Sequence, residues 1–234
     1  MPETDYYRLE SAASLDPSPV LAALVWAEGI DPPTPTTDLP EALEESLARA
    51  GSVGDSFVSA EARERVRRML RHGKYKPSGR GKPASEFLLR AALEGSFPLV
   101  NGPVDTNNLV SLESGLPGSI FDASLAGRHL LLRRGVAGES YVFNPSGQSI
   151  DLQDLLLVCR FAAGAWEPCG NPVKDSMATK VRPETRDVVA VLYAPADESV
   201  DSVERWAGRY AELLERHCNA STAGFRVGLD AGSG

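Results

Sequence analysis

The sequence predicts an α+β protein, and three observations lead to that class. Residues 41–112 contain segments whose apolar side chains recur with the 3.6-residue period of a helix. Residues 130–194 contain short runs rich in Val, Leu and Ile, bounded by turn residues, which is typical of strands. An amphipathic segment at 200–217 returns to the helical period. Helices and strands that occupy separate parts of a chain favour an α+β fold.

The N-terminal half is expected to hold one strand and three helices. Residues 19–27 are an apolar run that ends before Gly29, and the length of the run favours a buried strand. Residues 31–40 are rich in proline and threonine, so we expect an exposed connection there. The expected helices are 41–50, with acids in its first turn, 60–72, in which arginines surround a narrow apolar stripe, and 85–93.

The second half is expected to be mainly extended. The expected strands are residues 130–133, 140–143, 150–152, 155–159 and 187–194. Before the last of them, residues 166–183 form a long polar loop, a candidate second wall for a site. After the helix at 200–217, residues 220–234 are expected to be a loosely held tail. The expected units are an N-terminal strand and acidic helix (1–59), a central domain (60–195), a helix that completes it (196–218) and the tail (219–234).

The composition describes an ordinary folded protein. Its 234 residues are 42% hydrophobic, enough for a substantial core. No window approaches eighteen uninterrupted apolar residues, and the first five residues are acidic where a signal peptide would be basic. We therefore expect a cytoplasmic protein with no membrane partner. Cys159, Cys169 and Cys218 lack metal-site spacing and are expected to be structural thiols.

The densest uncharged polar cluster lies between Asn101 and Asp122. Thr106, Asn107 and Asn108 precede an apolar helical turn, for which Asp105 or Thr106 is the expected N-cap. A loop that contains Gly115, Pro117 and Gly118 should then end that helix. A helix start beside a glycine loop presents amides, a hydroxyl and backbone N–H groups to one small cavity. Such a cavity suits a neutral or anionic ligand better than a metal.

The spacing of residues in this stretch resembles the signature of the B3/B4 domain of the bacterial phenylalanyl-tRNA synthetase beta subunit, and of freestanding proteins similar to it. The matching positions are Val104-Asp105, Asn108, Leu112-Glu113, Pro117 and Phe121-Asp122. Weaker matches lie on both sides in the expected order: residues 82–90 with Gly95, residues 130–133, Gly138-Glu139, residues 156–160 and Thr185. The resemblance covers about residues 60–195. It implies a layered domain with a mixed sheet, a β-sandwich-like core and flanking helices.

The resemblance also implies a function. In phenylalanyl-tRNA synthetases this domain deacylates tRNA that is mischarged with tyrosine. Asn108 matches the motif asparagine of the editing pocket, and Ser119 occupies the position of a family histidine, so these two are the candidate catalytic residues. The candidate substrate-binding residues are Thr106, Asn107, Glu113, Gly118, Asn171, Lys174 and Asp175.

The sequence departs from the family pattern at the expected pocket. Ser119 cannot by itself act as a base at neutral pH. Asn107 stands where the synthetases usually have threonine, and after Asp187 the segment 187–193 contains only apolar residues and no glutamate. These differences leave open a different mischarged amino acid, or aminoacyl-tRNA binding without hydrolysis.

One segment carries a dense block of positive charge. The protein has a net charge of -8, yet residues 61–82 contain nine basic and only two acidic residues. Such a block can neutralise phosphates, although most charge runs are solvated surfaces. The resemblance favours RNA contact. The candidate RNA-binding residues are Arg67, Arg68, Arg71, Lys74, Lys76, Arg80 and Lys82.

Standard catalytic motifs are absent from the sequence. There is no phosphate-binding loop, no nucleophile elbow and no zinc-binding His or Cys pair. We therefore expect no metal and no cofactor, tRNA as the partner, and no DNA partner; the oligomeric state stays open. The leading hypothesis is hydrolysis of mischarged aminoacyl-tRNA in trans. The alternatives are a non-catalytic tRNA-binding or RNA-binding module, and a protein that binds a free amino acid or nucleoside.

Overall fold

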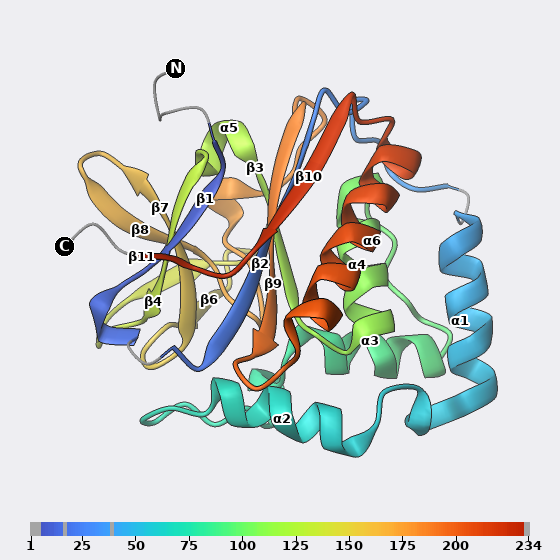
Figure 1. Cartoon of the computed structure of the whole chain (residues 1–234), viewed down its shortest axis with the longest axis horizontal. Helices are drawn as coiled ribbons and strands as arrows, with labels where there is room; N and C mark the ends of the chain where they lie inside the picture. Colours follow the sequence, from blue (N-terminus) through green and yellow to red (C-terminus); the bar gives the residue numbers. More distant parts are fainter. Residues whose placement is uncertain (1–5, 16–17, 38–39, 232–234) are drawn as a thin grey trace.

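The computed structural model of the chain describes residues 6–15, 18–37 and 40–231. Two sheets face each other, and helices cover the outer face of one of them (Figure 1). The five-stranded sheet has the order β11-β1-β4-β7-β8, and the four-stranded sheet has the order β10-β2-β9-β3. This layered arrangement confirms the predicted α+β class with a β-sandwich-like core.

The five-stranded sheet is mixed. β1 (Arg8–Ser11) pairs in parallel with both β4 (His129–Arg134) and β11 (Asp230–Ala231). β7 (Leu156–Ala162) pairs antiparallel with β4 and with β8 (Ala165–Gly170). A separate two-stranded hairpin, β5 (Ser140–Val142) with β6 (Ser149–Asp151), lies between β4 and β7 in the chain.

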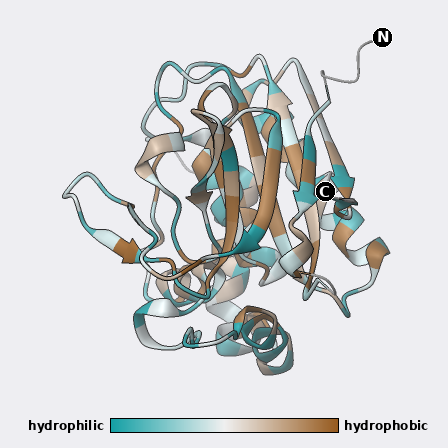
Figure 2. Ribbon diagram, turned by 90° about the vertical axis from the view of Figure 1, so that its left-hand side faces the viewer, coloured by the Kyte–Doolittle hydropathy of each residue, from teal (hydrophilic) through white to brown (hydrophobic). Residues whose placement is uncertain are grey.

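The four-stranded sheet is antiparallel and central. It contains β2 (Val20–Glu28), β3 (Gly118–Asp122), β9 (Asp187–Pro195) and β10 (Thr222–Val227). One face packs on the other sheet and the other face on helices, so β9 is apolar without alternation and is buried from Val188 onward. Figure 2 shows the hydrophobic segments concentrated on the strands in the middle of the molecule.

Six α-helices occur in the described residues. They are α1 (Glu41–Val53), α2 (Ala60–Leu70), α3 (Ala84–Leu93), α4 (Gly102–Ser114), the short α5 (Ala123–Ala126) and α6 (Val200–Cys218). Short 3-10 turns occur at Ala13–Leu15, Gly54–Phe57, Gly79–Gly81 and Met177–Thr179. In the described part of the chain, no helix is long and apolar enough to cross a membrane.

Caps explain where the predicted helices begin. Ser59 accepts a hydrogen bond from the backbone N–H of Ala62 at 3.1 Å and starts α2. Ser199 does the same for Ser202 at 3.2 Å and starts α6. α6 buries a stripe that includes Tyr210 against the four-stranded sheet and α4.

Three expectations about extended structure are wrong. Residues 222–227, expected in a loose tail, form β10, which pairs with β2, and residues 230–231 form β11. Residues 118–122, expected as the end of a glycine loop, form β3, because this segment pairs with β9. Part of the expected irregular loop forms β8, which pairs with β7. β3, β10 and β11 exist through long-range pairing that local turn residues do not reveal, whereas β8 pairs with β7 in a tight hairpin.

Candidate functional site

A cavity of about 230 Å³ lies at the β3 edge of the four-stranded sheet. Its walls come from α3, from α4 and Val100 shortly before it, from β3, and from the loop after β8. The lining residues are Ala84, Val100, Val104, Asn107, Asn108, Gly118, Ile120, Asn171, Val173, Lys174, Asp175, Lys180 and Val181. The long polar loop thus forms one wall of this cavity, and its role in a functional site stays a prediction.

The N-cap residue of α4 fixes where the helix begins, and therefore which of its polar side chains face this cavity. Asn101 is the N-cap, and its side-chain oxygen accepts from the backbone N–H of Val104 at 3.2 Å. Pro103 in the first turn has no backbone N–H that would need an acceptor, which favours a start at this point. The prediction of Asp105 or Thr106 as the cap is therefore wrong. Asp105 lies in the first turn, where it accepts from the backbone N–H of Val100 at 2.7 Å.

The two asparagines of the motif have different environments. The Asn107 side chain donates to the Gly118 carbonyl at 3.4 Å and accepts from the Tyr210 hydroxyl at 2.9 Å. A Cβ on Gly118 would lie 2.5 Å from Asn107 Oδ1, so this contact requires glycine. Asn108 is half-buried, and its side-chain amide has no hydrogen-bond partner within the described ranges. Asn107 thus joins α4 to β3 and α6, whereas the amide of Asn108 is available to a ligand.

The loop after β8 is shaped by Asn171. Its Oδ1 accepts from the backbone N–H groups of Val173 at 2.8 Å and Lys174 at 3.0 Å. Its Nδ2 donates to the Tyr141 hydroxyl at 2.6 Å, and that hydroxyl donates to the Lys174 carbonyl at 2.6 Å. Asn171 lines the cavity, but its polar atoms are used to hold the loop.

Charged groups lie side by side in the cavity wall. The Lys174 ammonium lies 3.8 Å from the centroid of the Phe143 ring, and burial together with the nearby Arg80 charge lowers the pKa of Lys174. Burial raises the pKa of Asp175 to about 7, while hydrogen bonds from Ser119 and from the Ile120 backbone lower it. Lys180, which the sequence analysis did not select, lines the same cavity.

Ser119 lies behind the cavity wall. It is 0% exposed, its Oγ is 3.0 Å from the Tyr193 hydroxyl, and it donates to the Asn171 carbonyl at 3.4 Å. Strand alternation explains this position, because Gly118 and Ile120 on either side line the cavity and Ser119 faces away. The structure therefore does not place Ser119 among the residues that a ligand would touch.

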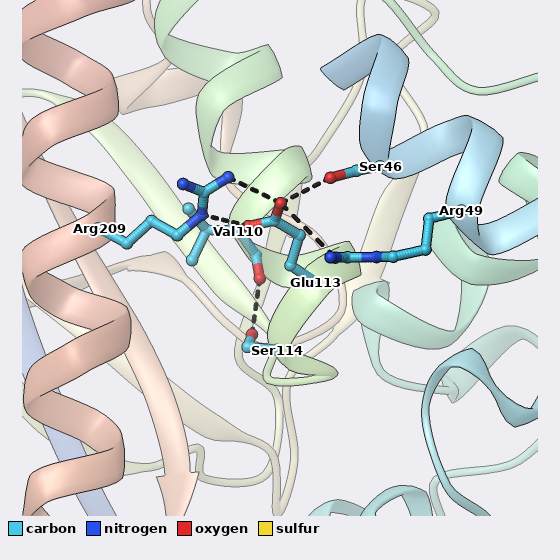
Figure 3. Close-up of polar contacts among 6 residues, drawn as sticks. All are labelled: Ser46, Arg49, Val110, Glu113, Ser114 and Arg209. Atoms are coloured by element: carbon cyan, nitrogen blue, oxygen red, sulfur yellow. Dashed lines mark hydrogen bonds and ion pairs between the residues drawn. The ribbon is translucent and has the colours of Figure 1, made fainter. Parts of the chain in front are cut away.

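Two further predicted site residues lie away from the cavity. Glu113, with a side chain only 4% exposed, accepts two hydrogen bonds from Arg209 and one from Ser46 at 2.6 Å (Figure 3). Thr106 is 1% exposed and packs against Cys218 at the end of α6. Neither residue lines the cavity, because helix packing turns both side chains into the interior.

Some residues of the basic segment form ion pairs within the protein, and others are exposed without such a pair among the described residues. Arg67 forms a forked pair with Glu86, at 2.6 Å and 2.5 Å, which makes it a structural residue. Arg71 lies 3.5 Å from Glu64 in an exposed pair. Lys82 is half-buried, and besides Arg71 four basic side chains of this segment are exposed: Arg68, Lys74, Lys76 and Arg80.

The loop that carries residues 74–82 adjoins the cavity. The Tyr75 hydroxyl donates to the Gly81 carbonyl at 2.5 Å and closes the loop. The backbone N–H of Ala84 donates to the Pro172 carbonyl at 2.8 Å, which joins the end of the loop to the cavity wall. The charge of Arg80 also acts on Lys174. The exposed basic side chains of this loop therefore lie close to the lysines that line the cavity.

No group of three or more His, Cys, Asp or Glu residues suited to a metal ion occurs within the described residues. The sequence signals that could have found Lys180 and Ile120 are weak. Lys180 stands in the polar loop already selected, and Ile120 alternates with Ser119 along β3. Only the pairing of β3 with β9 shows which of these residues face the cavity.

The fold and the cavity define an α+β sandwich protein with a small polar cavity at a sheet edge. A family model described as the B3/4 domain matches residues 76–219, more than half of the chain. The chain therefore belongs to the B3/4 domain family, which confirms the resemblance in its sequence.

Among solved structures, the chain is similar to an N-terminal fragment of the phenylalanyl-tRNA synthetase beta subunit from Pyrococcus horikoshii. The identity is 9% and the TM-score 0.46, over 97% of this chain and 53% of that one. This chain thus spans about half of the length of that fragment. A comparison with curated proteins finds no match.

Proposed function

We propose that this protein hydrolyses the ester bond of mischarged aminoacyl-tRNA in trans. The observation that carries the proposal is the composition of the cavity. Asn108, whose side-chain amide is free, lines one small space together with Asp175, Lys174 and Lys180. Membership of the B3/4 domain family and the adjoining exposed cations of the basic segment support a tRNA-linked substrate.

The chemistry needs little more than positioning. An aminoacyl ester is already activated, so a held water and donors directed at the carbonyl oxygen supply much of the barrier reduction. Asn108 and the two lysines provide such donors. At about 230 Å³ the cavity is smaller than most pockets for drug-sized ligands, which are about 300–1,000 Å³. Its size suits an aminoacyl group, with the nucleotide outside.

The deciding experiment is a deacylation time course with purified protein. A panel of mischarged tRNAs, including Tyr-tRNA(Phe), is compared with the same tRNAs correctly charged. Selective loss of one mischarged species supports the proposal and names the substrate. If every ester survives at high protein concentration while tRNA still binds, the protein is a non-catalytic tRNA-binding module. If neither occurs, both tRNA functions are wrong.

Asn108→Ala tests whether the side-chain amide of Asn108 takes part in deacylation. We expect deacylation to fall about 100- to 1,000-fold, the range for loss of one positioned donor. Gln148→Ala is the matched control, because it removes an exposed amide in the turn between β5 and β6. Equal activity of the two variants would remove Asn108 from the mechanism.

Lys76→Glu combined with Arg80→Glu tests whether the exposed basic side chains of this segment bind tRNA. These side chains are exposed, unlike Arg67, so their replacement should weaken tRNA binding and reduce its dependence on salt without unfolding the protein. Arg226→Glu is the control, because β10 lies at the opposite edge of the sheet from β3. Equal losses in both proteins would indicate a general charge effect and not a defined surface.

A further inference from the structure

Asp175 is held in an unusual way for a carboxylate. It lines the cavity, and its Oδ2 accepts from the backbone N–H of Ile120 at 3.2 Å. Its Oδ1 is buried and has no hydrogen-bond partner in the part of the chain that the structure describes. A buried carboxylate oxygen without a donor favours the protonated form of the group.

The surroundings fix the orientation of this group. A Cβ on Gly170 would lie 2.7 Å from Asp175 Oδ1 and 2.5 Å from the Phe121 ring, so the carboxyl group packs against a bare backbone. The Tyr193 hydroxyl lies 3.0 Å from Ser119 Oγ, and the nearby Ser119 hydroxyl lowers the pKa of Asp175. Asp175 is thus supported from behind while it borders the cavity.

The pKa of Asp175 depends on its burial and on the titratable groups around it. Burial raises the pKa of Asp175 to about 7, and the ammonium group of Lys180 acts in the opposite direction. The other titratable groups that act on it are Tyr141, Cys169, Tyr193 and Tyr210. Burial raises the pKa of each of these well above its ordinary value, so all four are neutral at pH 7. Asp175 therefore exchanges its proton in the pH range in which a general base is most effective.

We propose that Asp175 is the general base of this cavity, an inference that rests on the proposed deacylation. Its carboxylate takes a proton from the water whose oxygen forms a bond to the ester carbonyl carbon. The bond between that carbon and the ribose oxygen then breaks, and protonated Asp175 returns the proton to the ribose oxygen. The products are the free amino acid and the tRNA hydroxyl, and Asp175 is again a carboxylate. The donors of Asn108 and Lys180 stabilise the negative carbonyl oxygen in between.

Asp175→Asn is the first test, with a single-turnover rate measured from pH 5 to pH 9. The wild-type rate should rise with pH through a midpoint near 7, because only the carboxylate accepts the proton. The variant should lose about 100-fold or more in rate, together with the pH dependence, while its affinity for tRNA stays within about twofold. A residue with a merely structural role would not remove the pH dependence.

Lys180→Met gives an independent test that leaves Asp175 in place. The ammonium group lowers the pKa of Asp175, so its loss should move the midpoint of the rate profile to higher pH. This variant decides the question if Asp175→Asn fails to fold: an unchanged midpoint would overturn the inference.

The two proposals fail in different ways. If Asp175→Asn keeps the rate and the pH profile of the wild type, the general-base inference is wrong and the deacylase function stands. If the wild-type protein cleaves no mischarged ester, the proposed function is wrong and the inference falls with it.

Discussion

Arg209 of α6 and Glu113 of α4 form a forked ion pair between the two helices, with Nε to Oε2 at 2.5 Å and Nη2 to Oε1 at 2.8 Å (Figure 3). Ser46 of α1 donates to the same carboxylate at 2.6 Å, and Arg49 lies 4.0 Å away. The pair therefore connects three helices on the outer side of the sheet that carries the cavity.

Glu113→Gln should lower the free energy of unfolding without a comparable loss of the proposed deacylation activity. Breaking a buried ion pair costs about 3–5 kcal/mol. Because the Arg209 side chain is 37% exposed, we expect about 1–3 kcal/mol here. Urea unfolding measures the change. Glu94→Gln is the control, since its pair with Arg90 is exposed and should contribute little. Equal effects of the two substitutions would contradict a structural role for Glu113.

Asn107→Ala and Asn108→Ala should separate structure from ligand contact. Loss of Asn107 leaves the Tyr210 hydroxyl and the Gly118 carbonyl without their partner, which should cost about 2–4 kcal/mol of stability. Loss of Asn108 should change stability by less than about 0.5 kcal/mol. Thermal and urea unfolding of both variants check this order, and the reverse order would show that their positions are misassigned.

Asp175 should make the protein less stable as the pH rises. An aspartate in an unfolded chain titrates near pH 4, whereas burial raises the pKa of Asp175 to about 7. The folded state binds more protons between these values, so the free energy of unfolding falls as pH rises through this window.

Asp175→Asn should remove this loss of stability. Relative to the wild type, the variant should gain stability between about pH 4 and pH 8, by at most about 4 kcal/mol. Melting temperatures measured across this range test the sign. A constant difference between the two proteins would show that Asp175 does not titrate in this window.

Removal of residues 221–234 should prevent normal folding. β10 pairs with β2 through six residue pairs, and α6 packs on both strands. Without β10, the backbone donors and acceptors of β2 lose their partners along an exposed edge, which favours aggregation. Size-exclusion chromatography and urea unfolding give the result. A truncated chain that stays monomeric and unfolds at the full-length midpoint would show that β10 adds little.

Local sequence patterns were sufficient to predict the elements whose own residues show a clear strand or helix pattern. β2 and β9 are uninterrupted apolar runs, and α2 and α6 begin at serine caps and follow a 3.6-residue stripe. β3 and β10 were missed because turn residues or mixed polarity hide them. β3 contains a glycine next to a proline, and β10 pairs with a strand about 200 residues earlier in the chain.

The sequence by itself determined the family, the polar cluster around Asn108, the basic segment and the loop that forms the second wall. The tertiary structure decided which side chains face the cavity. Glu113 turns inward because Arg209 meets it from a helix 96 residues away, and Ser119 turns behind the wall because β3 pairs with β9. Periodicity gives the faces of a helix or strand. The elements that pack on each face determine which side chains stay free for a ligand, and only long-range contacts bring those elements together.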